Sequence, residues 1–324
     1  MATDCHTIGQ FYGVNGKNLR RQYRDYLSDF KNWEQNKHAK QWLVFPENIG
    51  PYLSIDETAL SKGELYTIIT NKQAKGKKGS IVAIFSGTRA EPIVEQLLKI
   101  SSKERDKVKE ITLDMANSMK TIAKKCFPKA IQVTDRFHLQ KLALEALQDI
   151  RVKHRWDAID LENERIKRAR LENKTFTPKE FGNGDTRKQL LARSRYLLYK
   201  APSNWTENQR IRSKILFDQY PDIKTAFDLA QGLRNIFNTA STIRVAYTKL
   251  AHWYKDVENT GFRAFNTIAN TIAINYRSIL NYFINRSTNA AAESFNAKIK
   301  AFRAQFRGVR NIEFFLFRLT TIFA

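Results

Sequence analysis

Residues 111–138 read ITLDMANSMKTIAKKCFPKAIQVTDRFH and decide the fold that we expect. The stretch alternates between two short β-branched segments, ITL and IQVT, and two segments with helical spacing. Pro128 ends the first helical segment, because proline lacks an N–H donor and disfavours helix in the residue before it. Asp114 and Asp135 each directly follow one of the strands. Chemistry in an open α/β sheet collects at the carboxyl ends of the strands, so these acids are candidate site residues.

Three further strands are expected upstream of this stretch. Residues 52–57 (YLSIDE), 64–70 (ELYTIIT) and 80–85 (SIVAIF) are apolar runs separated by turns, which predicts an antiparallel meander. We expect the first of these strands to end in two acids, Asp56 and Glu57. A helix follows from Pro92, since proline is tolerated in a first turn. A meander followed by alternating helices and strands predicts a mixed α/β sheet flanked by helices.

The rest of the chain has a helical pattern. Residues 7–30 predict two short helices around a glycine-containing turn, with the second helix at 17–30, a form typical of a helix-turn-helix that binds DNA. Residues 33–50 are expected to be a connector, and residues 139–283 predict helices throughout.

A last helix is predicted at residues 290–300 (AAAESFNAKIK), preceded by a cap at 286–289. Its apolar positions recur with helical spacing and predict a core stripe of Phe295, Ile299, Phe302 and Phe306. A second face has the same spacing and carries Glu293, Asn296, Lys300, Arg303 and Arg307. One acid therefore heads a basic ridge.

The chain is strongly basic. Its 324 residues include 55 Lys and Arg against 32 Asp and Glu, a formal net charge of +23. The excess is spread along the chain, and a polyanion such as nucleic acid is the partner that it favours, although a merely solvated basic surface is the alternative. Hydrophobic residues make up 42% of the chain, which indicates a folded protein.

Several classes of protein are disfavoured. Two cysteines are too few for a disulfide framework or a cysteine zinc site. The N-terminal residues lack the apolar core of a signal peptide, and no apolar run approaches the roughly 20 residues that span a bilayer. We expect a soluble, cytoplasmic protein without a membrane partner.

The acids that remain as candidates suit metal-assisted phosphoryl transfer. This chemistry needs carboxylates from separate elements that converge on divalent cations, and Mg²⁺ prefers hard oxygen ligands. The candidates are Asp56, Asp114, Asp135 and Glu293. Each alone is explained equally well as a turn former or a helix cap, but their joint placement favours a site.

Several blocks of the sequence carry a resemblance to a known family. SIDETALSKGELY, ITLDMANSM with CFPKAIQVTDRFH, and TNAAAESFNAKIK resemble the three catalytic blocks of bacterial insertion-sequence transposases, in the right order. The group they resemble most is the ISL-three (ISL3) family, in its ISAon-like branch, and LARSRYLLYKAPSNWTENQ is similar to that family's helical insertion. The resemblance covers nearly the whole chain.

The resemblance implies a ribonuclease-H-like catalytic domain with a large all-α insertion, and a catalytic, metal-binding triad of Asp56, Asp114 and Glu293. Asp114 is preferred as the middle acid because the second carboxylate of that fold ends its fourth strand. Asp135 is the alternative, and it forms an Asp-x-x-His block with His138. We expect Asp135 and His138 to support the site or to position DNA.

The same resemblance implies the domains and partners. The expected parts are a helix-turn-helix-like DNA-binding segment at 1–32, a connector at 33–50, the catalytic domain at 51–138 and 284–324, and the insertion at 139–283. The expected DNA-binding side chains are Lys17, Arg20, Arg21, Arg24, Asn296, Lys298, Lys300, Arg303 and Arg307. Expected cofactors are two Mg²⁺ ions, for which Mn²⁺ substitutes.

The implied activity is metal-dependent cleavage of DNA at insertion-sequence ends and strand transfer into target DNA. The implied setting is a homo-oligomer on DNA in the bacterial cytoplasm, associated with the nucleoid. Family members tend to carry a cysteine-rich zinc module ahead of the catalytic domain, so a separate polypeptide for the N-terminal region is a further expected partner. The alternatives are a DNA-binding protein without catalysis and a ribonuclease-H-like nuclease without strand transfer.

Overall fold

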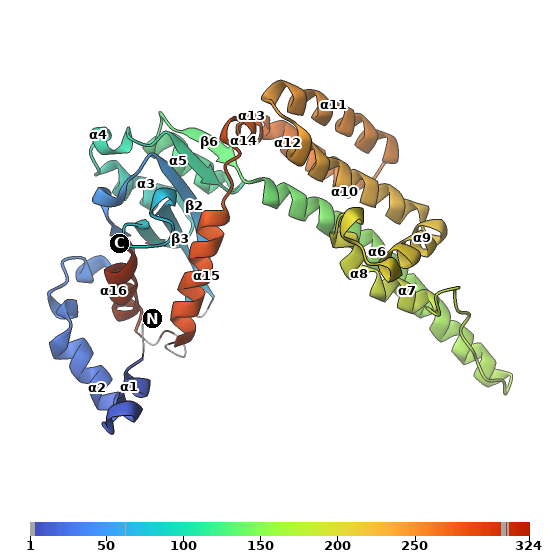
Figure 1. Cartoon of the computed structure of the whole chain (residues 1–324), viewed down its shortest axis with the longest axis horizontal. Helices are drawn as coiled ribbons and strands as arrows, with labels where there is room; N and C mark the ends of the chain where they lie inside the picture. Colours follow the sequence, from blue (N-terminus) through green and yellow to red (C-terminus); the bar gives the residue numbers. More distant parts are fainter. Residues whose placement is uncertain (1–3, 62, 306–308, 310) are drawn as a thin grey trace. The chain divides into compact units, whose positions relative to one another are not determined.

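The computed structural model describes residues 4–61, 63–305, 309 and 311–324. Within them the chain forms two compact units, which are described separately (Figure 1). The sheet unit comprises Met1–Asp135 and Asn285–Ala324, and the helical unit comprises Arg136–Ile284.

The sheet unit is built on a mixed sheet whose six described strands have the order β1-β4-β3-β2-β5-β6. The strands are β1 (Trp42–Val44), β2 (Tyr52–Ser61), β3 (Glu64–Asn71), β4 (Ile81–Ser86), β5 (Glu110–Leu113) and β6 (Ile131–Thr134). Antiparallel pairing joins β1 to β4, β4 to β3 and β3 to β2, whereas β2, β5 and β6 are parallel. The connections into β5 and β6 carry helices, since parallel neighbours need a crossover. The predicted mixed α/β sheet is therefore confirmed.

Strand β2 is longer than expected, so the prediction that it ends in the acids Asp56 and Glu57 is wrong. Its parallel ladder with β5 runs only as far as Ser54, which pairs with Thr112. The antiparallel ladder with β3 continues beyond Asp56 and keeps the strand extended to Ser61. Asp56 thus lies inside a strand, at the point where that strand has lost one of its two neighbours.

The segment expected to be a connector contributes the edge strand β1. Its three residues pair with β4, and the side chain of Leu43 is fully buried. The Gln35 side chain accepts a hydrogen bond from the Val44 N–H and donates one to the Val44 carbonyl, at 3.0 and 3.1 Å. A side chain therefore takes the place of a further strand at this edge, which a three-residue pattern could not predict.

Helices cover both faces of the sheet (Figure 1). One face packs against α3 (Ala90–Leu98) and α5 (Asn117–Cys126), and the other against α15 (Ala290–Gln305) and α16 (Ile312–Phe323). Side chains alternate between the two faces because successive strand residues point to opposite sides. The predicted core stripe of the last helix is confirmed for its three described members, Phe295, Ile299 and Phe302, and Phe306 lies outside the described residues.

The N-terminal segment begins with the two helices α1 (Cys5–Tyr12) and α2 (Gly16–Gln22). Asp4 and Asn15 cap them by accepting backbone hydrogen bonds, as expected for Asp and Asn at helix starts. The helix expected at 17–30 is interrupted: a π-helical turn occupies Tyr23–Leu27 and a 3₁₀ turn occupies Asp29–Asn32. The short helix α4 (Ser102–Arg105) precedes β5.

The helical unit consists of helices joined by turns and one longer loop. Its helices are α6 (Arg136–Leu171), α7 (Arg187–Arg193), α8 (Arg195–Tyr199), α9 (Glu207–Gln219), α10 (Pro221–Thr239), α11 (Ile243–Thr260), α12 (Arg263–Ile274), α13 (Tyr276–Leu280) and α14 (Tyr282–Asn285), the last of which ends at the boundary. Pro221 opens α10, where a missing N–H is tolerated. No helix in the described part of the chain combines the length and the apolar character needed to cross a membrane.

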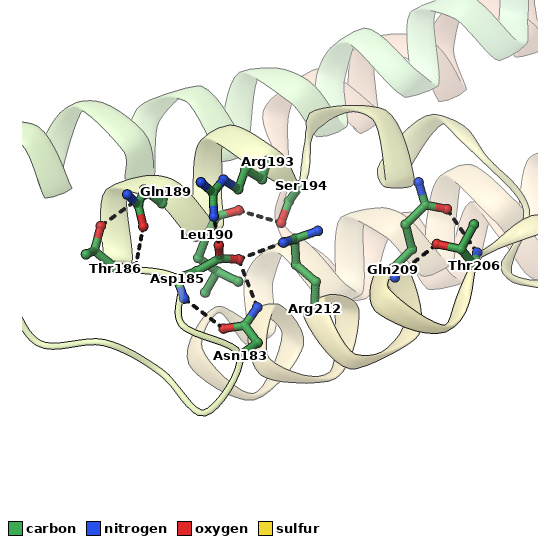
Figure 2. A network of polar contacts seen from close by, with 10 residues as sticks. All are labelled: Asn183, Asp185, Thr186, Gln189, Leu190, Arg193, Ser194, Thr206, Gln209 and Arg212. Carbon is green, nitrogen blue, oxygen red and sulfur yellow. Dashed lines mark hydrogen bonds and ion pairs between the residues drawn. The ribbon is translucent and has the colours of Figure 1, made fainter.

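A buried carboxylate organises the loop before α7 (Figure 2). Asp185 is fully buried and accepts hydrogen bonds from Arg193, from Arg212 at 2.7 Å and from Asn183 at 2.8 Å. Burial by itself raises the pKa of the Asp185 carboxyl, but the two arginines and Asn183 outweigh it and hold that pKa below its ordinary value. Asp185 thus ties the loop to α7 and α9.

Replacing this carboxylate is expected to destabilise the helical unit in a pH-dependent way. Asp185→Asn removes the charge that both arginines face, so we expect a loss of about 2 kcal/mol of unfolding free energy at pH 7. The folded-state pKa is depressed, so the difference is complete above about pH 4 and fades as pH falls through that pKa.

The measurement is urea unfolding at several pH values, followed by hydrogen exchange in α7 and α9. Asp218→Asn, at an exposed position of α9, is the matched control. A difference between wild type and Asp185→Asn that stays constant down to pH 3 would contradict the assignment.

Candidate active site

Three acids lie at or just beyond the end of the parallel pairing between β2, β5 and β6. Asp114 directly follows the last residue of β5, and Asp135 directly follows the last residue of β6. The last residues of these two strands, Leu113 and Thr134, are paired in register. Asp56 lies on β2, two residues beyond the last pair that β2 makes with β5, and Asp114 is equally far along β5. The register of the sheet therefore places all three acids at one edge of its parallel half.

The Asp56 carboxylate is held by two hydrogen bonds. The Glu57 N–H donates to Oδ1 at 2.9 Å, and the Asn296 side-chain amide donates to Oδ2 at 2.7 Å. Asn296 lies on α15, so this contact joins the last helix to the middle of the sheet. The two bonds together orient both oxygens of the carboxylate.

The segment that leads to Glu293 contacts β5 at two successive points. The Asn285 amide donates to Glu110 Oε2 at 3.0 Å, at the start of β5. The Thr112 hydroxyl then donates to Asn289 Oδ1 at 3.2 Å, two residues further along the strand. We call the three contacts Glu110–Asn285, Thr112–Asn289 and Asp56–Asn296 the return anchors.

The return anchors determine which way Glu293 faces. Asn289, Glu293 and Asn296 are separated by four and then three residues, so they share one face of the helix. The first and last of them are bonded to β5 and β2, which leaves Glu293 between these two contacts. Glu293 itself is exposed. Glu293 therefore lies on the same face of α15 as the two asparagines.

Asp114 lies in an electrostatic environment that sequence reasoning missed. Its Oδ1 accepts the Met115 N–H. Burial, and then the like charge of Asp114, raise the pKa of the Glu57 carboxyl. Burial lowers the pKa of Lys120, and the charge of Asp114 opposes this shift.

Glu57 and Lys120 are thus electrostatic neighbours of Asp114. Lys120 is half-buried on α5. The alternation of β2 shows that Glu57 and Asp56 point to opposite faces, but it gives no information about Asp114, which lies just beyond β5. The proximity of these charges depends on how the chain turns from β5 into α5.

The two candidates for the middle acid differ in accessibility. Asp114 is half-buried, whereas Asp135 is fully buried. His138 belongs to the helical unit, on the first turn of α6. A ligand has access to Asp114 and not, in this arrangement, to Asp135.

The donor set at this edge suits a hard divalent cation. No three Asp, Glu, His or Cys side chains of the described residues gather closely enough to hold a metal ion. Mg²⁺ is commonly held by one or two carboxylates together with water and substrate phosphate oxygens, so a full protein cage is not required. Asp56, whose carboxylate is oriented through both oxygens, fits such a role.

The expected DNA-binding side chains are placed as follows. Lys17 and Arg21 are exposed on α2, Arg20 is half-buried, and Arg24 forms an ion pair with Asp25 at 2.7 Å. On α15, Lys300 is exposed and Arg303 half-buried. Lys298 donates to the Gly76 carbonyl at 2.8 Å, and Arg307 lies outside the described residues.

Asn296 differs from the other side chains expected to bind DNA, because it is only 9% exposed and its amide is committed to Asp56. Asn289 was expected only to cap the last helix, and it instead contacts β5. The spacing of the two asparagines around Glu293 is visible in the sequence, but their partners on β5 and β2 are not.

The first return anchor includes a buried ion pair. Glu110 is 2% exposed, and its Oε1 lies 3.5 Å from the Lys72 ammonium nitrogen. Burial lowers the pKa of Lys72, and the nearby Glu110 carboxylate opposes that shift. The Glu110 charge therefore stabilises a lysine that would otherwise be buried without its main counter-charge.

Comparison with known proteins gives two findings. The sequence model of the ISL3 group of DDE transposases, described as "Transposase", matches residues 53–319. The transposase for insertion sequence element IS1001 of Bordetella parapertussis is 23% identical over 276 residues, which are 84% of this chain and 61% of that protein. The chain thus spans about three fifths of the length of that relative. The matched span of the family contains Asp56, Asp114, Asp135 and Glu293.

The Glu110 ion pair is expected to contribute strongly to stability. Glu110→Gln leaves the buried Lys72 charge without its partner, so we expect a loss of about 3 kcal/mol of unfolding free energy. The measurement is urea denaturation of the full chain, with hydrogen exchange in β5 reporting on the sheet unit. The exposed pair Glu95–Lys99 supplies the control, since Glu95→Gln should change stability by less than about 0.5 kcal/mol. Equal effects of the two changes would contradict a role for burial.

Proposed function

The chain belongs to the ISL3 family of DDE transposases, and on that premise we propose that it cleaves DNA at the ends of an insertion sequence and joins them to target DNA. The observation that carries the proposal is the docking of α15 through Asn289 and Asn296, which lie on either side of Glu293 in the sequence. Three acids from widely separated parts of the sequence then act on one phosphodiester.

We infer that the sheet unit is a ribonuclease-H-like catalytic domain. In that fold the second carboxylate ends the fourth strand, after a three-strand meander and one helix. Here β2, β3 and β4 form the meander and α3 follows. The next strand is β5, which takes the place of that fold's fourth strand, and Asp114 comes directly after it. The helical unit leaves the sheet unit after β6 and returns just before α15, as an insertion would.

We assign the triad to Asp56, Asp114 and Glu293. Accessibility favours Asp114 over Asp135 as the middle acid, because a cation and a phosphate need an open carboxylate. Asp135 and His138 are assigned supporting roles, in which they shape the end of β6 and the start of α6.

The chemistry follows from these residues. Asp56, Asp114 and Glu293 are the side chains that would hold divalent cations, most simply Mg²⁺ with Mn²⁺ as a substitute. When bound, such cations lower the pKa of an attacking water and stabilise the departing oxygen. Water attacks phosphorus at the element's end and the bond to the 3′-oxygen breaks, which releases a 3′-hydroxyl. That hydroxyl then attacks a phosphodiester of the target DNA. A bond forms between its oxygen and the target phosphorus, and the bond from that phosphorus to the target's own 3′-oxygen breaks, so the target strand is left with a free 3′-hydroxyl.

Basic side chains supply the affinity for DNA. Lys300 and Arg303 extend along α15 from Glu293, so they are placed to contact the phosphates that flank the reacting one. The basic residues of α2 and of the helical unit add contacts further along the duplex. Binding by such contacts weakens steeply with salt, because each neutralised phosphate releases counterions. A homo-oligomer on DNA belongs to this proposal.

The triad is tested by transposition of a marker flanked by the gene's own neighbouring DNA. Asp56→Asn, Asp114→Asn and Glu293→Gln should each reduce activity by roughly a thousandfold, since several kcal/mol of charge stabilisation are lost. Asp135→Asn should weaken activity much less. Each variant should bind end DNA as tightly as wild type in 100 mM salt, where the Debye length is about 10 Å.

The same series distinguishes the alternatives. An essential Asp135 with a dispensable Asp114 would reverse the assignment of the middle acid. Cleavage by the purified protein without strand joining would indicate a nuclease. Binding of end DNA without any metal-dependent cleavage would indicate a DNA-binding protein that has no catalytic activity.

A further inference from the structure

A role of Asn296 in DNA binding does not explain its contact with Asp56. We propose that Asn296 is a positioning residue, which fixes the Asp56 carboxylate for cation binding and, with Asn289, sets the rotation of α15 that presents Glu293. This role rests on the proposed function, because it presumes that Asp56 and Glu293 bind cations.

The burial of Asn296 is the first reason. Its side chain is 9% exposed and its amide nitrogen lies 2.7 Å from Asp56 Oδ2. A buried amide of this kind has little surface left for a phosphate, unlike the exposed Lys300 on the same helix. Removing either partner leaves a buried polar group unsatisfied, which costs about 1–3 kcal/mol.

The situation of Asp56 on its strand is the second reason. Beyond Ser54 the strand has lost its β5 neighbour, so only β3 continues to hold it. Along its own strand the carboxylate receives one bond, from the Glu57 N–H to Oδ1. Asn296 supplies the bond to the other oxygen and therefore fixes the plane of the carboxylate.

The chemical type of the side chain is the third reason. A neutral amide orients a carboxylate and leaves its negative charge in place for a cation. A lysine or arginine at this position would neutralise the carboxylate, and an aspartate would repel it. Partners of this kind orient metal ligands in many proteins, and their loss typically reduces metal affinity or activity by 10–100-fold.

The two asparagines together control Glu293. Asn289 is 1% exposed and bonded to Thr112, so the helix is held at both ends of the face that carries Glu293. One residue corresponds to about 100° of rotation in an α-helix of 3.6 residues per turn. A slip of α15 by a single position would therefore turn Glu293 away from Asp56, and both asparagine contacts would be broken by that slip.

The test compares Asn296→Ala and Asn296→Leu with Lys298→Ala. Leucine keeps the heavy-atom branching of asparagine and has no donor, so it tests the hydrogen bond even if alanine weakens folding. Lys298 anchors the same helix through the Gly76 carbonyl and forms no ion pair with a carboxylate of the described residues, which makes it the matched control. The full chain is used, and the probe is Mn²⁺ followed by electron paramagnetic resonance with and without end DNA.

We expect both Asn296 variants to raise the Mn²⁺ dissociation constant by about 10–100-fold, with DNA affinity unchanged. Their cleavage activity should recover when Mn²⁺ is raised by the same factor. Lys298→Ala should leave Mn²⁺ affinity within about twofold of wild type, because the carboxylates keep their partners.

Three outcomes would overturn the assignment. Unchanged Mn²⁺ affinity in both Asn296 variants would exclude positioning of Asp56. Weaker DNA binding with normal Mn²⁺ affinity would make Asn296 a DNA contact. Equal losses of Mn²⁺ affinity in the Asn296 and Lys298 variants would show that Asn296 only docks the helix. Mn²⁺ binding that survives Asp56→Asn would instead remove the proposed metal site, and the role of Asn296 with it.

Discussion

The packing of α15 against β2 is the constraint on which the site depends. Phe295, Ile299 and Phe302 are buried against the sheet, and each contributes about 2 kcal/mol through the apolar surface it removes from water. Apolar packing of this kind holds a helix on a sheet but tolerates rotation and sliding. The polar return anchors add what the apolar stripe lacks, because a hydrogen bond is made at only one register.

The order of the chain explains why such anchors are needed. The sheet unit is interrupted after Asp135 and resumes at Asn285, so its last catalytic candidate arrives from a segment separated by the whole helical unit. Glu293 is far from β2 and β5 along the chain, so only tertiary contacts can bring it near these strands. The contacts of Asn285, Asn289 and Asn296 supply that connection one after another along the face of β5 and onto β2. The site is therefore complete only when the returning segment is docked.

The distribution of charge separates two tasks. The chain carries a net charge of +23, which attracts a polyanion from any direction. The acids at the sheet edge do the opposite locally: burial, and then the like charge of Asp114, raise the pKa of Glu57. DNA phosphate and these carboxylates repel each other unless cations lie between them. This agrees with the divalent metal ions that DDE transposases generally use.

The sequence by itself determined the alternation of strands and helices, the core stripe of the last helix and the family, because periodicity and local motifs are properties of neighbouring residues. It also placed Asp114 and Asp135 directly after strands. The tertiary structure alone decided how far β2 extends past Asp56, since that depends on β3. It alone showed the edge strand β1, the burial of Asp135 and the partners of Asn289 and Asn296. Each of these is set by residues that are distant in the chain and brought together by packing, and no local pattern records such contacts.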